Sequence, residues 1–118
     1  MTGPAEIVLF VYGSLKRGQA NHCELSGARC LGPAVTARAF ALREIAGYPA
    51  LVPGDRAIAG ELYQVSELRL RALDAFEGEA YVRRQIELSD GAHAIAYLAC
   101  SAETGTPWPF CEWPAPRS

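Results

Sequence analysis

The stretch LFVYGSLKRG at residues 9–18 decides which architecture the rest of the chain can complete. A nearly continuous apolar run, rich in β-branched residues, ends there in Gly-Ser, and the chain then turns basic. Unbroken runs of this kind are typical of strands that are buried on both faces. We therefore predict a buried strand over residues 6–12, followed by a loop over residues 13–18.

The size and charge of the chain exclude several classes of protein. Its 118 residues fit one domain, and half of them are hydrophobic, which excludes a disordered chain. The formal net charge of −2 lacks the basic excess of a nucleic-acid-binding domain. We predict a single domain over residues 1–118 with no nucleic-acid partner, present as a monomer or a homodimer.

The N-terminal segment and the cysteines indicate in which cellular compartment the protein is expected. The N-terminal segment has no basic region, and the apolar run at residues 7–11 is too short for a signal-peptide core or a membrane span. None of the four cysteines belongs to a CxxC pair, so a zinc ribbon is not indicated. Cys100 lies in an apolar run and is expected to be buried and reduced. These features predict a cytoplasmic protein that does not associate with a membrane.

Segments in which apolar and polar residues alternate, or that are bounded by Gly and Pro turn signals, predict the remaining strands. The polar-rich segment 19–32 fits one short helix that ends before Gly27 or Gly32. Residues 47–55 are expected to form a short extended piece between turn signals. Further strands are expected over residues 35–45, 58–65, 81–88 and 92–100.

A second helix and a tail complete the prediction. Ser66 is a preferred N-cap and Gly78 suits the position after a helix, so a helix is expected between them. Residues 101–118, rich in Pro and Trp, are expected to pack on the body without a regular element. Because the strands are mostly consecutive and lack crossover helices, we predict an α+β fold: a small mixed or antiparallel, barrel-like sheet with two short helices.

Glu77 is an ionisable residue at a position where the helix is expected to pack against the sheet. It follows Leu70 and Leu73 at helical spacing, so the three side chains project to one side. The helix face expected to pack on the sheet carries Leu68, Ala72, Leu73 and Phe76. Partial burial and the helix dipole would both raise the pKa of Glu77, which suits general acid–base chemistry. The alternative is a solvated carboxylate, or one paired with Arg83 or Arg84.

The loop over residues 13–18 has two interpretations that its residues leave open. Successive backbone N–H groups can point the same way and bind a carboxylate or carbonyl oxygen, or the segment is an ordinary strand end. A phosphate loop and a Ser14 nucleophile are weakly supported, since the motifs that define them are missing. A metal or thiol site at His22, Cys23 and Cys30 is a further alternative, although this spacing matches no common ligand pattern.

Six stretches carry a resemblance to a known family. They are FVYGSLKRG (10–18), NH (21–22), YPALVPG (48–54), GELYQV (60–65), LDAFEG (73–78) and YVRR (81–84). In this order they resemble the γ-glutamylcyclotransferase-like family, and most closely its small bacterial members related to γ-glutamylamine cyclotransferase. The resemblance implies a small mixed barrel whose active cavity lies beside the end of the first strand.

The same resemblance implies roles for individual residues. Glu77 is expected to be the catalytic acid and base, with no metal and no cofactor. Tyr81 and Arg83, which match a Y-x-R pair, are expected to shape or polarise the pocket. The residues implied to bind substrate, the first four as a loop that acts largely through its main chain, are Tyr12, Gly13, Ser14, Leu15, Tyr48, Tyr81 and Arg83.

The implied reaction is an intramolecular aminolysis. The α-amine of a small-molecule γ-glutamyl substrate attacks the γ-carbonyl, which closes 5-oxoproline and releases an amine or amino acid. The alternative for the same fold is a non-catalytic protein that binds γ-glutamyl or carboxylate ligands. Residues 101–118 match no part of the resemblance, so the leaving group stays open.

Overall fold

The strand expected at the start of the chain is β1, Glu6–Val11, in the computed structural model, which describes residues 6–115. It lies between β5 (Ala59–Ser66), to which it is antiparallel, and β7 (His93–Ala99), to which it is parallel. Leu9 faces one hydrophobic cluster and Phe10 faces the other, and both are fully buried. Because both faces of β1 are covered, its unbroken apolar sequence is explained.

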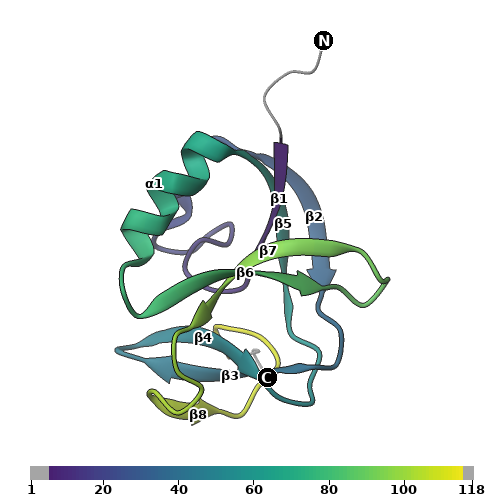
Figure 1. The fold of residues 1–118 in the computed structure, drawn as a ribbon, viewed down its shortest axis with the longest axis vertical. Helices are drawn as coiled ribbons and strands as arrows, with labels where there is room; N and C mark the ends of the chain where they lie inside the picture. Colours follow the sequence, from purple (N-terminus) through teal and green to yellow (C-terminus); the bar gives the residue numbers. More distant parts are fainter. Residues whose placement is uncertain (1–5, 116–118) are drawn as a thin grey trace.

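Eight strands form one sheet in the part of the chain that is described, and Figure 1 shows it curled into a half-barrel. The order is β2-β5-β1-β7-β4-β3-β8, and β6 pairs with β7 beside this path. The pairings of β1 and β4 with β7 are parallel and the others are antiparallel, which confirms the predicted mixed sheet. The strands not yet given are β2 (Arg29–Val35), β3 (Phe40–Ile45), β4 (Tyr48–Pro53), β6 (Tyr81–Glu87) and β8 (Thr106–Trp108).

The helix α1, Glu67–Glu77, begins and ends where the sequence predicts. The Ser66 hydroxyl accepts a hydrogen bond from the Arg69 amide at 3.1 Å, and Gly78 follows the helix with a φ of 75°. No helix within residues 6–115 is long and apolar enough to cross a membrane.

The predicted buried face of α1 was wrong in part. Leu70 and Leu73 are buried, whereas Leu68 is 79% exposed and Phe76 is 40% exposed. The helix has more apolar residues than its narrow contact with the sheet can cover. Its packed stripe runs through Leu70 and Leu73 to Glu77, which therefore continues the buried row.

The segment after β1 contains less helix than predicted. Only a four-residue 3-10 helix forms, η1 (His22–Leu25), because Ser26 and Gly27 then adopt left-handed backbone angles. The fold therefore has one α-helix, and the expectation of two short helices was wrong. The following residues form β2, an edge strand that the sequence patterns did not indicate.

The strand expected over residues 35–45 forms only in its second half, as β3, and Val35 is instead the last residue of β2. Thr36 is fully buried at the break, where its Oγ1 accepts a hydrogen bond from the Ile58 amide at 2.9 Å and donates one to the Ala37 carbonyl at 2.8 Å. These bonds stop β2 at Val35 and let the chain turn before β3. The extended piece expected over residues 47–55 is β4, which forms a hairpin with β3.

The C-terminal segment also differs from its prediction. Residues within it form β8, which pairs with β3, so the expectation of no regular element was wrong. Arg43 holds the turn before β8, since its guanidinium donates to the Thr104 and Gly105 carbonyls, each at 2.7 Å. Trp113 packs against a hydrophobic cluster, whereas residues 116–118 lie outside the described residues.

The expectation for Cys100 was wrong as well. The residue directly follows β7 and is exposed, because the chain leaves the sheet there. Its thiol donates a hydrogen bond to the Glu79 carbonyl at 3.0 Å.

Candidate active site

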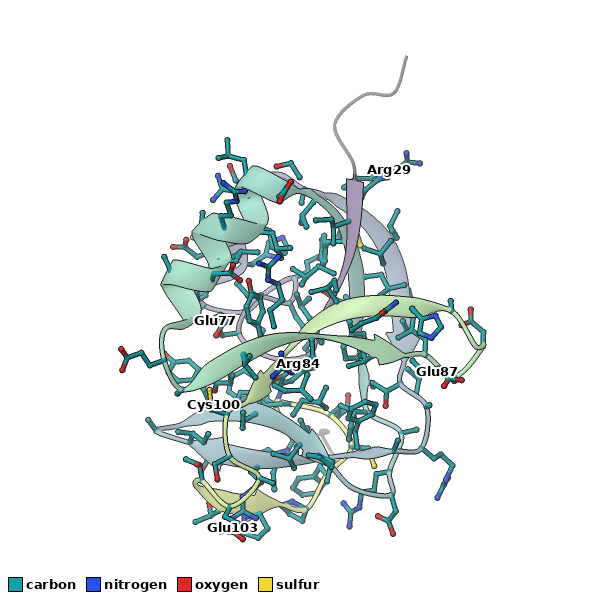
Figure 2. All side chains as sticks on the ribbon, in the orientation of Figure 1. Arg29, Glu77, Arg84, Glu87, Cys100 and Glu103 are labelled. Atoms are coloured by element: carbon teal, nitrogen blue, oxygen red, sulfur yellow. The ribbon has the colours of Figure 1, made fainter. Side chains whose placement is uncertain are left out.

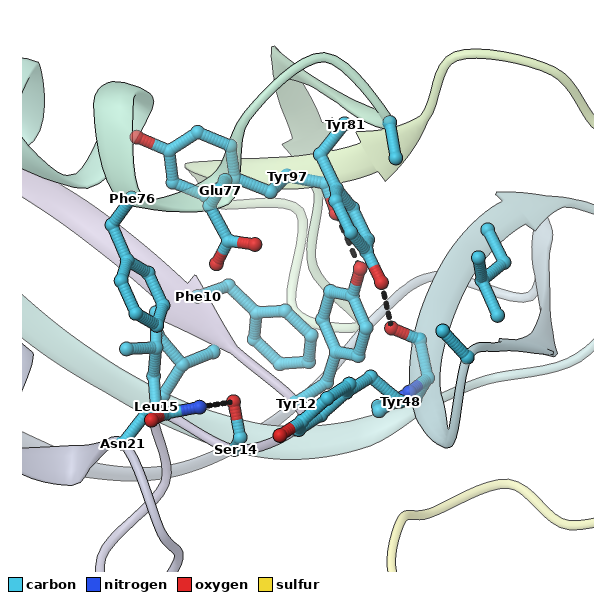
Figure 3. Close-up of a pocket in the computed structure, with 16 residues that line it drawn as sticks. Phe10, Tyr12, Ser14, Leu15, Asn21, Tyr48, Phe76, Glu77, Tyr81 and Tyr97 are labelled. Atoms are coloured by element: carbon cyan, nitrogen blue, oxygen red, sulfur yellow. Dashed lines mark hydrogen bonds between the residues drawn. The ribbon is translucent and has the colours of Figure 1, made fainter.

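A cavity of about 370 Å³ opens where the end of β1, the β3–β4 hairpin and the end of α1 meet. Figure 3 shows the side chains that surround it. Arg83 is the one candidate site residue that does not line this cavity. The candidates that do are Tyr12, Gly13, Ser14, Leu15, Tyr48, Glu77 and Tyr81.

The Glu77 carboxyl points into the cavity from the last residue of α1 (Figure 3). Burial disfavours its charged form and raises the pKa of Glu77 to about 7. The two ion pairs within the described residues join Arg71 to Glu67 and Arg83 to Asp74, so neither neutralises Glu77. A carboxyl in this state can both take up and release a proton near neutral pH.

In the loop after β1, backbone carbonyl groups accept hydrogen bonds from amides of the same segment. The Gly13 carbonyl accepts from the Lys16 amide at 3.0 Å, and the Ser14 carbonyl accepts from the Asn21 amide at 2.9 Å. Within residues 6–115, the amides of Gly13, Ser14 and Leu15 donate to no other protein group. Three successive N–H groups, each from a residue that lines the cavity, are thus left without an acceptor among residues 6–115.

Gly13 is required by a close approach rather than by unusual backbone angles. A Cβ atom at this position would lie 2.6 Å from Cγ of Pro49 on β4. No larger residue fits while the hairpin keeps its place, so glycine lets the loop and the hairpin form one wall.

Three side chains outside the loop fix its conformation. Asn21 Nδ2 donates to Ser14 Oγ at 2.9 Å, and the His22 ring Nδ1 lies 2.9 Å from the Leu15 carbonyl, to which it must donate. Glu61 Oε1 accepts from the Arg17 amide at 2.9 Å. Asn21 and His22 lie in the NH match and Glu61 lies in the GELYQV match, but nothing in these stretches indicated that the three side chains hold the loop.

The hydroxyls of two tyrosines link the strands around the cavity through hydrogen bonds. The Tyr12 hydroxyl donates to the Tyr97 carbonyl and accepts from the Leu51 amide at 3.0 Å, so it joins the end of β1 to β7 and β4. The Tyr81 hydroxyl donates to the Pro49 carbonyl at 3.0 Å. Burial raises the pKa of Tyr12 well above its usual value and that of Tyr81 to about 12, so both stay protonated near neutral pH.

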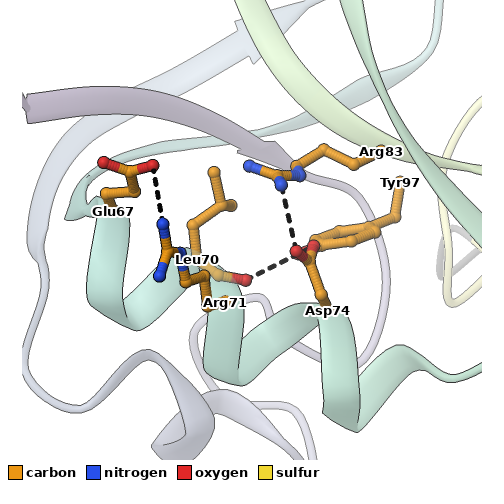
Figure 4. A network of polar contacts seen from close by, with 6 residues as sticks. All are labelled: Glu67, Leu70, Arg71, Asp74, Arg83 and Tyr97. Atoms are coloured by element: carbon orange, nitrogen blue, oxygen red, sulfur yellow. Dashed lines mark hydrogen bonds and ion pairs between the residues drawn. The ribbon is translucent and has the colours of Figure 1, made fainter.

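Arg83 acts from behind the cavity, in the network drawn in Figure 4. Its guanidinium lies 3.1 Å from Asp74 Oδ2, while the Tyr97 hydroxyl donates to Asp74 Oδ1 at 2.6 Å. Asp74 precedes Glu77 by one helical turn. The network therefore anchors the helix end that carries Glu77, and neither Arg83 nor Asp74 reaches the main cavity.

The alternative site at His22, Cys23 and Cys30 is not assembled as a ligand group. His22 is bonded to the loop, and Cys23 is exposed. In the described part of the chain, no three His, Cys, Asp or Glu side chains gather in a way that could hold a metal ion.

Comparison with known proteins places the chain among relatives of one kind. A family model described as gamma-glutamyl cyclotransferase, AIG2-like, matches residues 9–115. A protein of Vibrio cholerae, provisionally named a gamma-glutamylcyclotransferase, is 40% identical over 70 residues, or 59% of this chain and 61% of that protein. The human gamma-glutamylaminecyclotransferase is 37% identical over 83 residues, or 59% of this chain and 52% of the human protein.

A solved structure supports the same relationship. The crystal structure of a mouse AIG2-like protein superposes with a TM-score of 0.69 at 31% sequence identity, and the match covers 80% of this chain and 78% of the mouse chain. The chain spans between half and two thirds of the two curated relatives given above. Since the family model covers nearly the whole described chain, this protein belongs to the AIG2-like gamma-glutamyl cyclotransferase family.

Proposed function

We propose that this protein is a γ-glutamyl cyclotransferase that converts a γ-glutamyl compound into 5-oxoproline and a free amine or amino acid. One observation carries the proposal: the Glu77 carboxyl, with a pKa raised to about 7, shares a cavity with the available N–H groups of residues 13–15. Membership of the family supports the reaction class.

The loop residues would bind the polar end of the substrate. The amides of Gly13, Ser14 and Leu15 can donate to a carboxylate, or to the oxygen on which negative charge develops during attack. The cavity would hold the γ-glutamyl chain bent, so that the α-nitrogen meets the γ-carbonyl carbon. Correct placement of reacting groups contributes several kcal/mol to catalysis, on the order of 7 kcal/mol in favourable cases.

Glu77 would carry the proton between the two nitrogen atoms. The α-nitrogen attacks the γ-carbonyl carbon, a carbon–nitrogen bond forms, and Glu77 accepts a proton from the attacking nitrogen. The tetrahedral intermediate then expels the second nitrogen, which takes that proton from Glu77 as its bond to carbon breaks. One carboxyl suffices for both transfers because its pKa lies near neutrality.

The test is release of 5-oxoproline from a panel of γ-glutamyl compounds, measured by mass spectrometry. Glu77→Gln keeps the shape of the side chain but cannot exchange the proton, so turnover should fall at least ~100-fold. Glu87→Gln is the matched control, since Glu87 is exposed and lies at the far end of β6 from the cavity (Figure 2).

Turnover by Glu77→Gln close to that of the natural chain would remove the catalytic assignment. Calorimetric binding of a γ-glutamyl compound without any product would instead favour the alternative, a non-catalytic binding protein of the same fold.

A further inference from the structure

The C-terminal segment after β8 is bonded to the body of the protein at two points. Arg56, in the loop between β4 and β5, donates a hydrogen bond from its guanidinium to the Pro109 carbonyl at 2.7 Å. The amide of Ala59, the first residue of β5, donates to the Cys111 carbonyl at 2.8 Å. These bonds give the segment a defined path from β8 back past β4, which Figure 1 shows in yellow.

This path brings Trp113 against a residue of the cavity wall. The rings of Trp113 and Tyr48 lie 6.4 Å apart between centroids, with 37° between their planes. Trp113 also packs against the hydrophobic cluster that contains Tyr12 and Leu51, so its own position is fixed by the core. Tyr48 lines the cavity, whereas Trp113 does not. Trp113 can therefore act on a bound ligand only through another residue.

The Tyr48 ring depends on this contact. Its side chain is 45% exposed, so the core restricts it only in part. Trp113 is the one aromatic ring within residues 6–115 that pairs with it. A contact between two aromatic rings is strong enough to favour one rotamer of a half-exposed side chain.

The residue after Tyr48 extends the effect to other parts of the cavity. The Pro49 carbonyl accepts a hydrogen bond from the Tyr81 hydroxyl at 3.0 Å, and the Pro49 ring leaves no room for a Cβ atom at Gly13. Because Tyr48 and Pro49 share a planar peptide bond, displacement of one moves the other. The start of β4 is thus the place where the tail, the loop after β1 and β6 are connected.

We infer that Trp113 is a positioning residue for ligand binding: it holds Tyr48 and, through Pro49, the loop at Gly13 in the arrangement that binds the substrate. The C-terminal segment is then part of the active site and not only a support for the fold. The inference rests on the proposed function in one respect, that the ligand is a γ-glutamyl compound.

Steady-state kinetics test the inference with two donors, γ-glutamylethylamide and γ-glutamylalanine. In Trp113→Ala, KM should rise about three- to tenfold while kcat stays within about twofold. A merely structural defect would act differently, because a smaller folded fraction lowers the apparent kcat and leaves KM unchanged. Trp113→Phe retains a ring and should keep KM within about twofold of the natural chain. Where Trp113→Ala does not fold, Trp113→Leu takes its place.

Two further variants locate the effect. Phe110→Ala is the matched control, since Phe110 is an exposed aromatic residue of the same segment whose ring pairs with Trp108 rather than with Tyr48. It should leave KM unchanged. The double variant Tyr48→Ala/Trp113→Ala should have the same KM as Tyr48→Ala alone, because Trp113 acts through Tyr48.

Fluorescence gives a second readout that needs no turnover. The chain contains two tryptophans, so Trp108→Phe leaves Trp113 as the only one and Trp113→Phe leaves Trp108. Each change is made together with Glu77→Gln, and γ-glutamylethylamide is added to saturation. The emission of Trp113 should change, since Trp113 contacts Tyr48. The emission of Trp108 should stay the same, because its ring pairs with Phe110, which does not line the cavity.

The outcomes separate this inference from the proposed function. An unchanged KM in Trp113→Ala overturns the inference, and so do effects that multiply in the double variant or an equal response of the two tryptophans. Absence of 5-oxoproline from both donors counts against the proposed function alone, and calorimetry with the natural chain and Trp113→Ala then decides the inference. A dissociation constant about three- to tenfold higher in Trp113→Ala supports it. An equal constant, or no binding to the natural chain, overturns it.

Discussion

The Tyr97 hydroxyl lies 2.6 Å from Asp74 Oδ1, so β7 is bonded to the last turn of α1. Arg83 on β6 contacts the other carboxylate oxygen at 3.1 Å. Three elements therefore meet at one carboxylate, three residues before Glu77. This junction fixes the end of the helix from outside, which leaves the Glu77 carboxyl unpaired by charge and directed into the cavity.

Removal of the Tyr97 hydroxyl should destabilise the protein. In Tyr97→Phe, Asp74 loses a hydrogen bond to its charged group, and the free energy of unfolding should fall by about 1–2 kcal/mol. Urea denaturation measures the change. Tyr48→Phe is the control, since Tyr48 is 45% exposed, and its change should stay within about 0.5 kcal/mol. Equal effects of the two variants would contradict the anchoring role of this junction.

The stability of the protein should depend on Glu77 between about pH 4.5 and pH 7. Its pKa rises from 4.5 to about 7 on folding, so in this window the folded state binds more protons than the unfolded state. The contribution of Glu77 is therefore fully present below pH 4.5, and the free energy of unfolding falls as pH rises toward 7.

At about 1.4 kcal/mol per pKa unit, the free energy of unfolding can fall by at most about 3.5 kcal/mol between these pH values. Access of solvent to the cavity makes the fall smaller. Denaturation of the natural chain and of Glu77→Gln at pH 4.5 and pH 8 measures it. The variant should gain stability relative to the natural chain at the higher pH. Glu87→Gln should follow the natural chain, and a Glu77→Gln profile parallel to both would contradict the raised pKa.

The rate of the proposed reaction should depend on the same group. Only ionised Glu77 can accept the proton of the attacking nitrogen, so kcat/KM should rise through a pKa of about 7 in the free enzyme. The measurement is 5-oxoproline release at low substrate concentration across roughly pH 3.5–9, a range that spans both values. A rise centred near pH 4.5, the ordinary value of a glutamate, would show that burial does not tune this carboxyl.

Gly13→Ala should displace the loop from the hairpin. The new Cβ would meet Pro49 Cγ at 2.6 Å, and overpacking of this kind costs about 1–3 kcal/mol. We expect lower stability and weaker binding of γ-glutamyl compounds. The double variant with Pro49→Ala removes the clashing atom and should recover part of both losses. No recovery would mean that Gly13 is needed for another reason.

Glu61→Ala should loosen the loop from its other side. Glu61 Oε1 accepts hydrogen bonds from the Arg17 amide and from the hydroxyl of Tyr63, a residue that is almost fully buried. Loss of this acceptor should lower the free energy of unfolding by about 1–3 kcal/mol and raise KM. Glu61→Gln retains an acceptor oxygen and should lose less of both. If the two variants behave alike, the negative charge of Glu61 matters rather than its hydrogen bonds.

The strands and the helix whose pattern and boundaries can be recognised from neighbouring residues were predicted correctly. β1 and β5 are apolar runs bounded by turn residues, and the Ser66 cap and Gly78 delimit α1 within a single stretch of sequence. The information needed for these elements lies within a few residues of each of them. The same holds for β6 and β7, which form a hairpin around a short turn.

The edge strands were missed because their formation depends on distant partners. β2 contains Gly32 and Pro33, and β8 contains Pro107, residues that weaken a strand signal but are tolerated at the margin of a sheet. Pairing with β5 and β3 decides their conformation. The break at Thr36 likewise depends on its hydrogen bond with Ile58, 22 residues away.

By itself the sequence determined that Glu77 shares a helix side with Leu70 and Leu73, and that the chain turns at Gly13 after a buried strand. Both statements follow from helical period and local backbone chemistry. Only the tertiary structure decided that Arg83 pairs with Asp74 rather than with Glu77, and that Pro49 closes on Gly13. Burial and charge pairing arise when segments far apart in the chain come together, and they set the pKa and surroundings of Glu77.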